Sequence, residues 1–254
     1  MLPTLLIGPL ALPTYPIFLL LALWLGMAVS ARRAGQLELE GDHIYNAGLY
    51  ALIAGIIGAR LWFVLSHWDN YAANLGQALS LSRSALSVGE GLILAGVVVL
   101  VYLQLNKVPL GRFLDALAPG LAIAIVIANI GAFLGGEALG APSSVPWAIE
   151  LVNLTRHPVQ LYEATVGVGV VAILYFVRYF RPWPGFQFWT WVMLYSTGRL
   201  FLEIFRDRPA LVGAGFLAVQ IIALSAVVVS LAVMAYNFCN IPVGPEAEKH
   251  EFVR

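Results

Sequence analysis

Apolar runs of roughly 18 to 23 residues recur along the chain, and each is long enough to cross the hydrocarbon core of a bilayer as a helix. Backbone N–H and C=O groups inside a bilayer must be paired within the protein, so such runs fold as helices. Charged residues make up only 11% of the 254 residues, which is too few to cover a soluble domain of this length. The sequence therefore predicts an integral membrane protein of the all-α class.

Seven spans are predicted, and they form a single transmembrane domain. Residues 1–14 are apolar but interrupted by proline and glycine, so they are predicted to lie along the membrane surface as an interfacial arm. A seven-helix bundle follows over residues 15–236, and a polar cytoplasmic tail over residues 237–254 closes the chain. The spans cover about 15–31, 44–65, 88–105, 113–134, 161–177, 186–205 and 214–236.

Lysine and arginine are distributed unevenly between the two sides of this bundle. One side holds Arg32, Arg33, Lys107, Arg112, Arg178, Arg181, Lys249 and Arg254. The other side holds Arg83, Arg156, Arg206 and Arg208. The side that is richer in these residues is usually cytoplasmic. We therefore predict that the N-terminus lies outside, that the C-terminus is cytoplasmic and that the long loop at 135–160 faces outward.

Charge, cysteine and histidine content exclude several classes of function. The formal net charge is zero, which gives no basis for a nucleic-acid partner. The single cysteine, Cys239, permits neither an intrachain disulfide nor a cluster of thiolate ligands. His157 has no second histidine or cysteine at the spacing of a metal site, so no metal is predicted. A transporter is disfavoured because the spans lack charged residues near the bilayer midplane and lack paired broken helices.

A dense polar stretch, residues 156–163, stands at the mouth of the fifth span. It reads Arg156-His157-Pro158-Val159-Gln160-Leu161-Tyr162-Glu163. Polar side chains at this depth need water, another polar group or a ligand, because contact with bare hydrocarbon costs several kcal/mol each. One interpretation is a helix start, with Pro158 in the first turn and Glu163 near the positive helix end. The other is a ligand site, with His157 as either an interface hydrogen-bonding residue or a proton acceptor.

Arginines near the outer ends of the spans point to an anion. Arg60 lies within the second span, where it either snorkels to the headgroups or faces the bundle interior. Arg199, Glu203 and Arg206 recur at helical spacing on the sixth span and share one face. An Arg199–Glu203 ion pair alone would explain two of them. Together with Arg156, however, these guanidinium groups suit phosphate, because each can bind two oxygens in one plane.

Three further polar residues have a structural and a functional interpretation. Asn129 either caps a break in the fourth span or lines a cavity. Glu137 follows Gly135-Gly136 near the outer surface and is either a solvated loop carboxylate or part of the site. Glu90 begins the third span, where a carboxylate also favours the positive end of a helix.

The chain resembles bacterial prolipoprotein diacylglyceryl transferases over nearly its whole length. The matching segments include the arm leading to Tyr15, Gly58-Ala59-Arg60-Leu61, Leu114-Asp115-Ala116-Leu117-Ala118-Pro119, Gly136-Glu137-Ala138-Leu139-Gly140, the stretch at 156–163, and Tyr195-Ser196-Thr197-Gly198-Arg199 through Glu203-Ile204-Phe205-Arg206. Members of this family transfer a diacylglyceryl group from phosphatidylglycerol to the cysteine thiol of a lipoprotein signal sequence, at the bacterial plasma membrane. They need no metal or organic cofactor.

The resemblance implies two partners, the phospholipid phosphatidylglycerol and a prolipoprotein signal peptide. It also assigns a role to each candidate residue. Lipid- or phosphate-binding candidates are Tyr15, Arg60, Asn129, Glu137, Arg156 and Arg206. Catalytic candidates are Arg199, Glu90 and His157. Glu163 and Glu203 are expected to pair with the arginines.

Two positions depart from the family pattern, and they leave two hypotheses open. Gly89 stands where the family has the histidine of a His-Gly-Gly segment, and Asn129 replaces the arginine of Gly-Arg-Ile-Gly-Asn-Phe. Loss of a phosphate-facing arginine removes about 2–4 kcal/mol of transition-state stabilisation, on the order of a hundredfold in rate. Glu90 would have to replace the histidine as base, although a carboxylate beside a phosphate is electrostatically unfavourable. The chain is therefore either a transferase-like protein or a non-catalytic relative, a lipid-binding or scaffolding subunit of a membrane complex.

Overall fold

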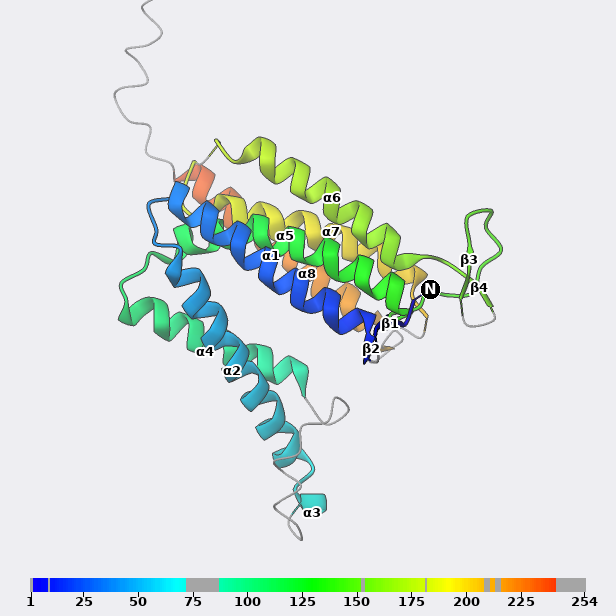
Figure 1. The fold of residues 1–254 in the computed structure, drawn as a ribbon. Helices are drawn as coiled ribbons and strands as arrows, with labels where there is room; N and C mark the ends of the chain where they lie inside the picture. Colours follow the sequence, from blue (N-terminus) through cyan, green and yellow to red (C-terminus); the bar gives the residue numbers. More distant parts are fainter. Residues whose placement is uncertain are drawn as a thin grey trace, which may run out of the picture. The chain divides into compact units, whose positions relative to one another are not determined.

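The computed structural model describes residues 2–8, 10–71, 87–151, 154–180, 182–207, 211–212 and 216–240. It is dominated by helices (Figure 1), which are α1 (Thr14–Gln36), α2 (Asp42–Ser66), α3 (Trp68–Tyr71), α4 (Val88–Leu105), α5 (Leu110–Gly135), α6 (Val159–Val177), α7 (Phe186–Leu202), the 3₁₀ turn η3 (Glu203–Phe205) and α8 (Ala218–Cys239). The predicted tail beyond residue 240 lies outside the described residues, as do Arg83, Arg181, Arg208, Lys249 and Arg254, which the predicted orientation used.

Six helices within the described ranges are long and apolar enough to cross a membrane. They are α1, α2, α4, α5, α6 and α8. The prediction of an all-α, multi-pass membrane protein is confirmed to this extent. The region predicted as the sixth span folds as α7, which has 17 residues and continues into η3. This helix is shorter than the six others because the chain tightens to a 3₁₀ turn at Glu203.

Three short antiparallel hairpins lie among the described residues, one before α1 and two between later helices. They are β1 (Thr4–Ile7) with β2 (Leu10–Pro13), β3 (Ile149–Leu151) with β4 (Leu154–Arg156), and β5 (Leu211–Val212) with β6 (Phe216–Leu217). The first hairpin occupies the predicted arm and is fastened to the end of α5, because the Leu2 N–H donates to the Leu134 carbonyl at 3.0 Å. The last hairpin explains why α8 begins at Ala218 and not at residue 214, where the final span was predicted to start.

The chain divides into two compact units, Met1–Val29 with Leu114–Arg254, and Ser30–Phe113. In the second unit, α2 packs along α4 through small residues. A Cβ on Gly91 would lie only 2.5 Å from the backbone oxygen of Gly55, so the two backbones approach too closely for any larger side chain. The Ser87 N–H also donates to the Ala59 carbonyl at 3.0 Å, which fixes the start of α4 beside α2. The expectation of a single domain stays a prediction.

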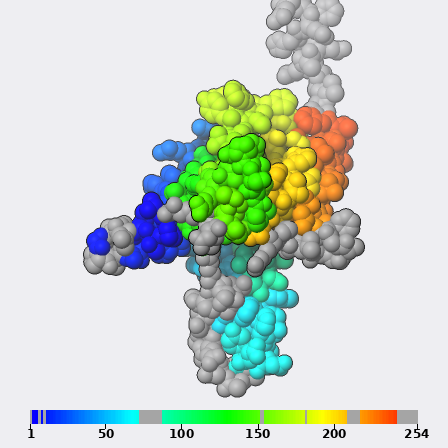
Figure 2. Space-filling view, turned by 90° about the vertical axis from the view of Figure 1, so that its right-hand side faces the viewer, coloured from blue at the N-terminus to red at the C-terminus, as the bar shows by residue number. Residues whose placement is uncertain are grey.

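In the first unit, α7 lies between α6 and α8, as the yellow-green, yellow and orange segments show (Figures 1 and 2). Ala118 and Ala122 of α5 pack against Val170 and Leu174 of α6, and all four are buried. The buried Gln187 at the start of α7 donates to the Leu174 carbonyl at 3.0 Å. Apolar packing and a few internal hydrogen bonds thus hold α7 in place, as expected where lipid offers no polar partner.

Asp115 of α5 caps the N-terminus of α7 across the helix interface. Its carboxylate is buried and accepts the backbone N–H groups of Gly185 at 2.7 Å and Phe188 at 3.0 Å. These donors have no intrahelical partner, and the helix end is partly positive, so a carboxylate is the best-matched cap. This contact sets the height of α7 against α5 and therefore the depth of Arg199.

Asp115→Ala is expected to destabilise the protein by about 2–3 kcal/mol, because two buried donors lose a charged acceptor. Thermal unfolding in detergent, followed by loss of helical circular dichroism, measures the effect. Asp42→Ala, which removes an exposed carboxylate from the first turn of α2, is the matched control. Equal midpoints for the two variants would show that the Asp115 cap contributes no stability.

Candidate functional site

Four charged side chains form a closed ring at one end of α6 and α7. Glu163 of α6 accepts from Arg199 of α7 and, at 2.5 Å, from Arg206. Arg199 also donates to Glu203 of η3 at 2.7 Å, and the Arg206 Nε lies 3.6 Å from the same carboxylate. Each arginine therefore contacts both carboxylates. We call these four residues the charged ring.

Burial makes this ring electrostatically unusual. The side chains of Glu163 and Glu203 are only 5% and 4% exposed, whereas those of Arg199 and Arg206 are 17% and 23% exposed. Two positive and two negative charges balance, so the ring satisfies itself within an apolar bundle, where an isolated charge would be very costly. The guanidinium groups are the accessible half of the ring, and an anion entering from solvent would meet them first.

The local sequence explains how the ring is built. Arg199 and Glu203 are one helical turn apart, which gives the ion pair expected from their spacing. The pair is not self-contained, because η3 ends the helix and Arg206 takes an extended conformation that turns its side chain back to Glu163. Glu163 lies in the second turn of α6, whose N-cap is Pro158. Sequence spacing could not reveal these longer-range partners.

Arg156 is held next to this ring by a ladder of backbone contacts. It is buried and donates to the Gly140 carbonyl at 3.0 Å and to the Asp207 carboxylate at 2.7 Å. Gly140 forms an isolated antiparallel β-bridge with Arg206, and Pro142 forms one with Arg156. The segment 140–142 therefore pairs with both backbone segments that carry these arginines. Glycine is required there, since a Cβ on Gly140 would lie 2.1 Å from the His157 carbonyl oxygen.

Asp207 is a residue that sequence reasoning missed. In the sequence Arg206-Asp207-Arg208, a carboxylate between two arginines looks like an ordinary solvated charge of a loop. The structure shows that it pairs with Arg156, 51 residues away in the chain. Each of the three arginines in this region therefore has a carboxylate partner.

Glu137 and Tyr15 lie at the same end of the first unit. The buried Gln160 donates to the Glu137 backbone carbonyl at 2.7 Å, and the Glu137 N–H donates to Ala132 at 2.9 Å. Tyr15 packs on the end of α5, because a Cβ on Gly135 would lie 3.0 Å from the Tyr15 Cβ. The two predicted headgroup residues therefore flank the end of α5.

His157 belongs to an aromatic network at the start of α6. Its Nδ1 lies 3.3 Å from the Tyr162 hydroxyl, which accepts the indole N–H of Trp147 at 2.7 Å. The ring centroid of Phe205 lies 5.0 Å from that of His157 and 6.0 Å from that of Tyr162. If Nδ1–H donates to the Tyr162 hydroxyl oxygen, the lone pair resides on Nε2, where it can accept a proton, and the ring is held in one orientation. Tyr162 belongs to the polar stretch that the sequence singles out, whereas Trp147 gives no functional signal in the sequence.

The remaining candidates lie on α5, α2 and α4. Asn129 donates its side-chain amide to the Ile125 carbonyl at 3.0 Å, within its own helix α5. Arg60 is buried in α2, with its guanidinium 5.2 Å from the Tyr71 ring centroid. Gly89 and Glu90 lie in the first turn of α4, and a Cβ on Gly89 would meet no heavy atom of the described residues within 4 Å. Arg60, Gly89 and Glu90 belong to the Ser30–Phe113 unit.

Taken together, the ring and its neighbours present guanidinium groups backed by buried carboxylates. A phosphate monoester or diester could bind the exposed edges of Arg199 and Arg206, because planar guanidinium groups match phosphate oxygens in pairs. The carboxylates would keep both arginines in position while they do so. This arrangement suits binding and stabilisation of phosphate and needs no metal for that purpose.

Comparison with known proteins agrees with this chemistry. A family model described as prolipoprotein diacylglyceryl transferase matches residues 3–236. A protein of Clostridioides difficile named phosphatidylglycerol–prolipoprotein diacylglyceryl transferase is 28% identical over 222 residues, which cover 87% of this chain and 89% of the relative. Proteins of the same name from Thermosynechococcus vestitus and Corynebacterium efficiens are 28% and 30% identical, over 88% and 91% of this chain and 88% and 78% of their own.

Proposed function

The chain belongs to the prolipoprotein diacylglyceryl transferase family, and on that premise we propose that it transfers diacylglycerol from phosphatidylglycerol to a prolipoprotein cysteine. The relatives that share most of its length carry this activity in their names. The observation that carries the proposal is the charged ring, which presents two positioned guanidinium groups at the end of a membrane bundle. A phospholipid phosphate lies at such a depth.

The reaction sets clear demands on these residues. The cysteine sulfur forms a bond to the glyceryl carbon while the bond from that carbon to the phosphate oxygen breaks. Glycerol phosphate leaves, and the thiol proton passes to a base. Charge accumulates on the leaving phosphate, so donors positioned there stabilise the transition state more than the ground state.

We assign the phosphate to Arg199 and Arg206, with Glu163 and Glu203 holding both guanidinium groups in place. Arg156, tied to Asp207, supplies a third positive charge at the outer loop. His157, oriented by Tyr162, is the proton acceptor that the geometry favours in this unit. Tyr15 and Glu137 help to shape the headgroup site beside α5. The roles of Arg60 in phosphate binding and of Glu90 as base stay predictions.

We also propose that all seven long helices, α7 included, cross the bacterial plasma membrane with the N-terminus outside. The support is the lysine and arginine asymmetry of the loops, together with the length of α7, 17 residues, which continues into η3. Cysteines introduced after Ala141 are expected to react with an impermeant reagent in intact cells. Cysteines introduced in the loop at 178–184 are expected to react only after permeabilisation. Labelling of the 178–184 loop from outside would reverse the proposed orientation.

A second candidate function is favoured by one observation. In the family, the positions of Gly89 and Asn129 carry a histidine and an arginine. In this chain Gly89 has no side chain, and Asn129 donates a hydrogen bond within its own helix, so neither position supplies a base or a positive charge. A protein with an intact lipid site but without chemistry would be a non-catalytic relative, a lipid-binding or scaffolding subunit of a membrane complex.

The test separates the two candidates directly. Purified protein is mixed with phosphatidylglycerol and a peptide that bears a lipoprotein-type cysteine, and release of glycerol phosphate is followed over time. We expect slow turnover, on the order of a hundredfold or more below a relative with the histidine and arginine in place. No release above the protein-free rate would remove the transferase proposal and leave the non-catalytic one. A rate equal to that of the relative would show that another group supplies the missing functions.

A further inference from the structure

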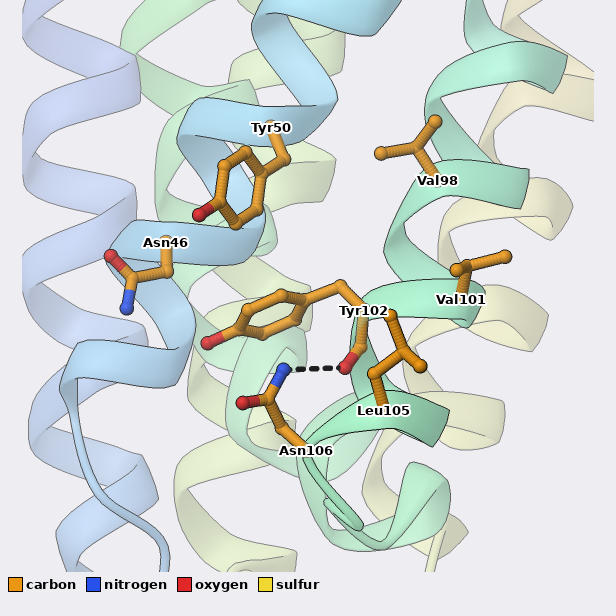
Figure 3. Close-up of a pocket in the computed structure, with 7 residues that line it drawn as sticks. All are labelled: Asn46, Tyr50, Val98, Val101, Tyr102, Leu105 and Asn106. Carbon is orange, nitrogen blue, oxygen red and sulfur yellow. Dashed lines mark hydrogen bonds between the residues drawn. The ribbon is translucent and has the colours of Figure 1, made fainter.

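An open groove of about 470 Å³ lies between α2 and α4, near the helix ends joined to the loops at 37–41 and 106–109 (Figure 3). All the residues that line it belong to the Ser30–Phe113 unit, and none is a member of the charged ring. The groove is therefore a feature that the proposed transfer reaction does not use.

The groove has one aliphatic wall and several hydrogen-bonding side chains beside it. Val98 and Val101 of α4, with Leu105, give it an aliphatic wall. Toward the loop end it is lined by two carboxamides, Asn46 and Asn106, which lie beside the phenol of Tyr102 (Figure 3). A groove that combines an aliphatic wall with hydrogen-bonding side chains matches a molecule that carries both an apolar chain and polar groups.

The polar end is held in a fixed arrangement. The Tyr102 hydroxyl lies 2.9 Å from His43 Nδ1, and the Tyr102 and Tyr50 ring centroids are 5.4 Å apart. The Asn106 amide donates to the Tyr102 carbonyl at 2.8 Å (Figure 3), which uses one of its two hydrogens. His43 and Tyr50 of α2 thus contact the Tyr102 ring, while the Asn106 amide is held against the last turn of α4.

The position of the groove on two membrane-spanning helices restricts the kind of molecule that can bind in it. Both helices are long and apolar enough to span the membrane, and Val101 and Leu105 are 48% and 77% exposed. Carboxamides and phenols facing only hydrocarbon would cost several kcal/mol, so this surface needs a partner with acceptors at headgroup level. A glycerophospholipid supplies an acyl chain for the valines and ester and phosphate oxygens for the amides.

Two charged residues at the loop end of the groove restrict which lipid headgroup fits there. Lys107 directly follows Asn106, and Asp42 lies one helical turn before Asn46 on the same face of α2. We propose that this groove binds a zwitterionic phospholipid with a primary amine headgroup, phosphatidylethanolamine, in the leaflet at this end of α2 and α4. Lys107 and Asn106 contact the phosphate, and Asp42 accepts from the ammonium. Phosphatidylglycerol has no ammonium for Asp42 to bind, so the groove discriminates against the proposed diacylglyceryl donor.

Native mass spectrometry of the full chain in detergent, titrated with single lipids, tests this proposal. We expect one phosphatidylethanolamine per chain to be retained about tenfold more strongly than phosphatidylglycerol or phosphatidylcholine. Asn106→Leu and Asp42→Asn should each lower that retention by about tenfold. Asn240→Leu is the matched control, since Asn240 makes the same kind of amide bond, to the Tyr236 carbonyl at 2.7 Å, but lines no part of the groove.

Several outcomes would overturn the proposal. Equal retention of the three lipids would mean that the groove meets only bulk lipid. Unchanged retention in both variants would place the bound lipid elsewhere. A species with the mass of two chains that disappears in Asn106→Leu would show that the groove contacts a second copy of the chain. If Asn106→Leu does not fold, Asp42→Asn carries the test, because it changes one exposed side chain.

Discussion

Glu163→Gln is expected to lower the free energy of unfolding by about 3–5 kcal/mol, the cost of leaving buried charges without their partner. Glu163 bridges Arg199 and Arg206, and its side chain is only 5% exposed. An amide in its place offers one neutral oxygen to two guanidinium groups, so one positive charge in the bundle loses its counterion. The change should appear as a fall in Tm on the order of 10 °C in detergent.

Glu150→Gln is the matched control for this variant, because Glu150 is an exposed carboxylate on β3. Its Tm should equal that of the unmodified chain within about 1 °C. An equally small effect at Glu163 would mean that water or another group already compensates the two arginines and that the charged ring is not a stabilising unit.

Arg199→Gln separates stability from lipid binding within the same ring. Without Arg199, the ion pair that remains to Glu203 among the described residues is the 3.6 Å contact to Arg206, so the fold should again be destabilised. If Arg199 also binds phosphate, phosphatidylglycerol should raise the Tm of this variant by less than it raises the Tm of the unmodified chain. A lipid-induced shift of unchanged size would remove the phosphate-binding role and leave Arg199 structural.

The second large effect is a gain of activity. Gly89→His together with Asn129→Arg is expected to raise the rate of diacylglyceryl transfer by about a hundredfold or more, because it restores the histidine and the phosphate-facing arginine of the family pattern. The structure favours the first change, since a side chain at Gly89 meets no heavy atom within 4 Å. The second requires Asn129 to give up its bond to Ile125 and the arginine to reach the phosphate.

Glycerol phosphate release measures this gain, with each single variant beside the double one. The family pattern assigns both groups to the same reaction, so the double variant is expected to exceed the product of the single gains. The Tm of every variant is compared first, so that a misfolded protein is not mistaken for an inactive one. A folded double variant that remains inactive would favour the scaffolding role.

Local patterns in the sequence were enough to predict most helices. The span predicted at 88–105 coincides with α4, because a polar segment precedes it and Asn106-Lys107 ends it. The prediction failed at 214–217, where Phe216 and Leu217 pair back onto β5 before α8 begins. An apolar segment of this kind fits a strand and a helix equally well, and only the tertiary fold decides between them.

The candidate site was predictable only in part, for a related reason. The Arg199–Glu203 contact follows from helical spacing, whereas the Glu163–Arg206 and Arg156–Asp207 pairs join residues 43 and 51 positions apart. Such partners depend on how helices and loops pack, and this packing leaves no periodic pattern in the local sequence. Asn129 shows the converse, since its amide donates to a carbonyl within α5, and no feature of the sequence distinguishes that from a cavity-facing amide.

The most direct test of the central proposal is the mass of the acceptor peptide after incubation with the unmodified chain and phosphatidylglycerol of defined acyl composition. The proposal predicts a slow, protein-dependent gain of one diacylglyceryl group on the cysteine thiol, which is abolished when the peptide carries serine in its place. A peptide whose mass is unchanged after prolonged incubation with folded, lipid-binding protein would contradict it.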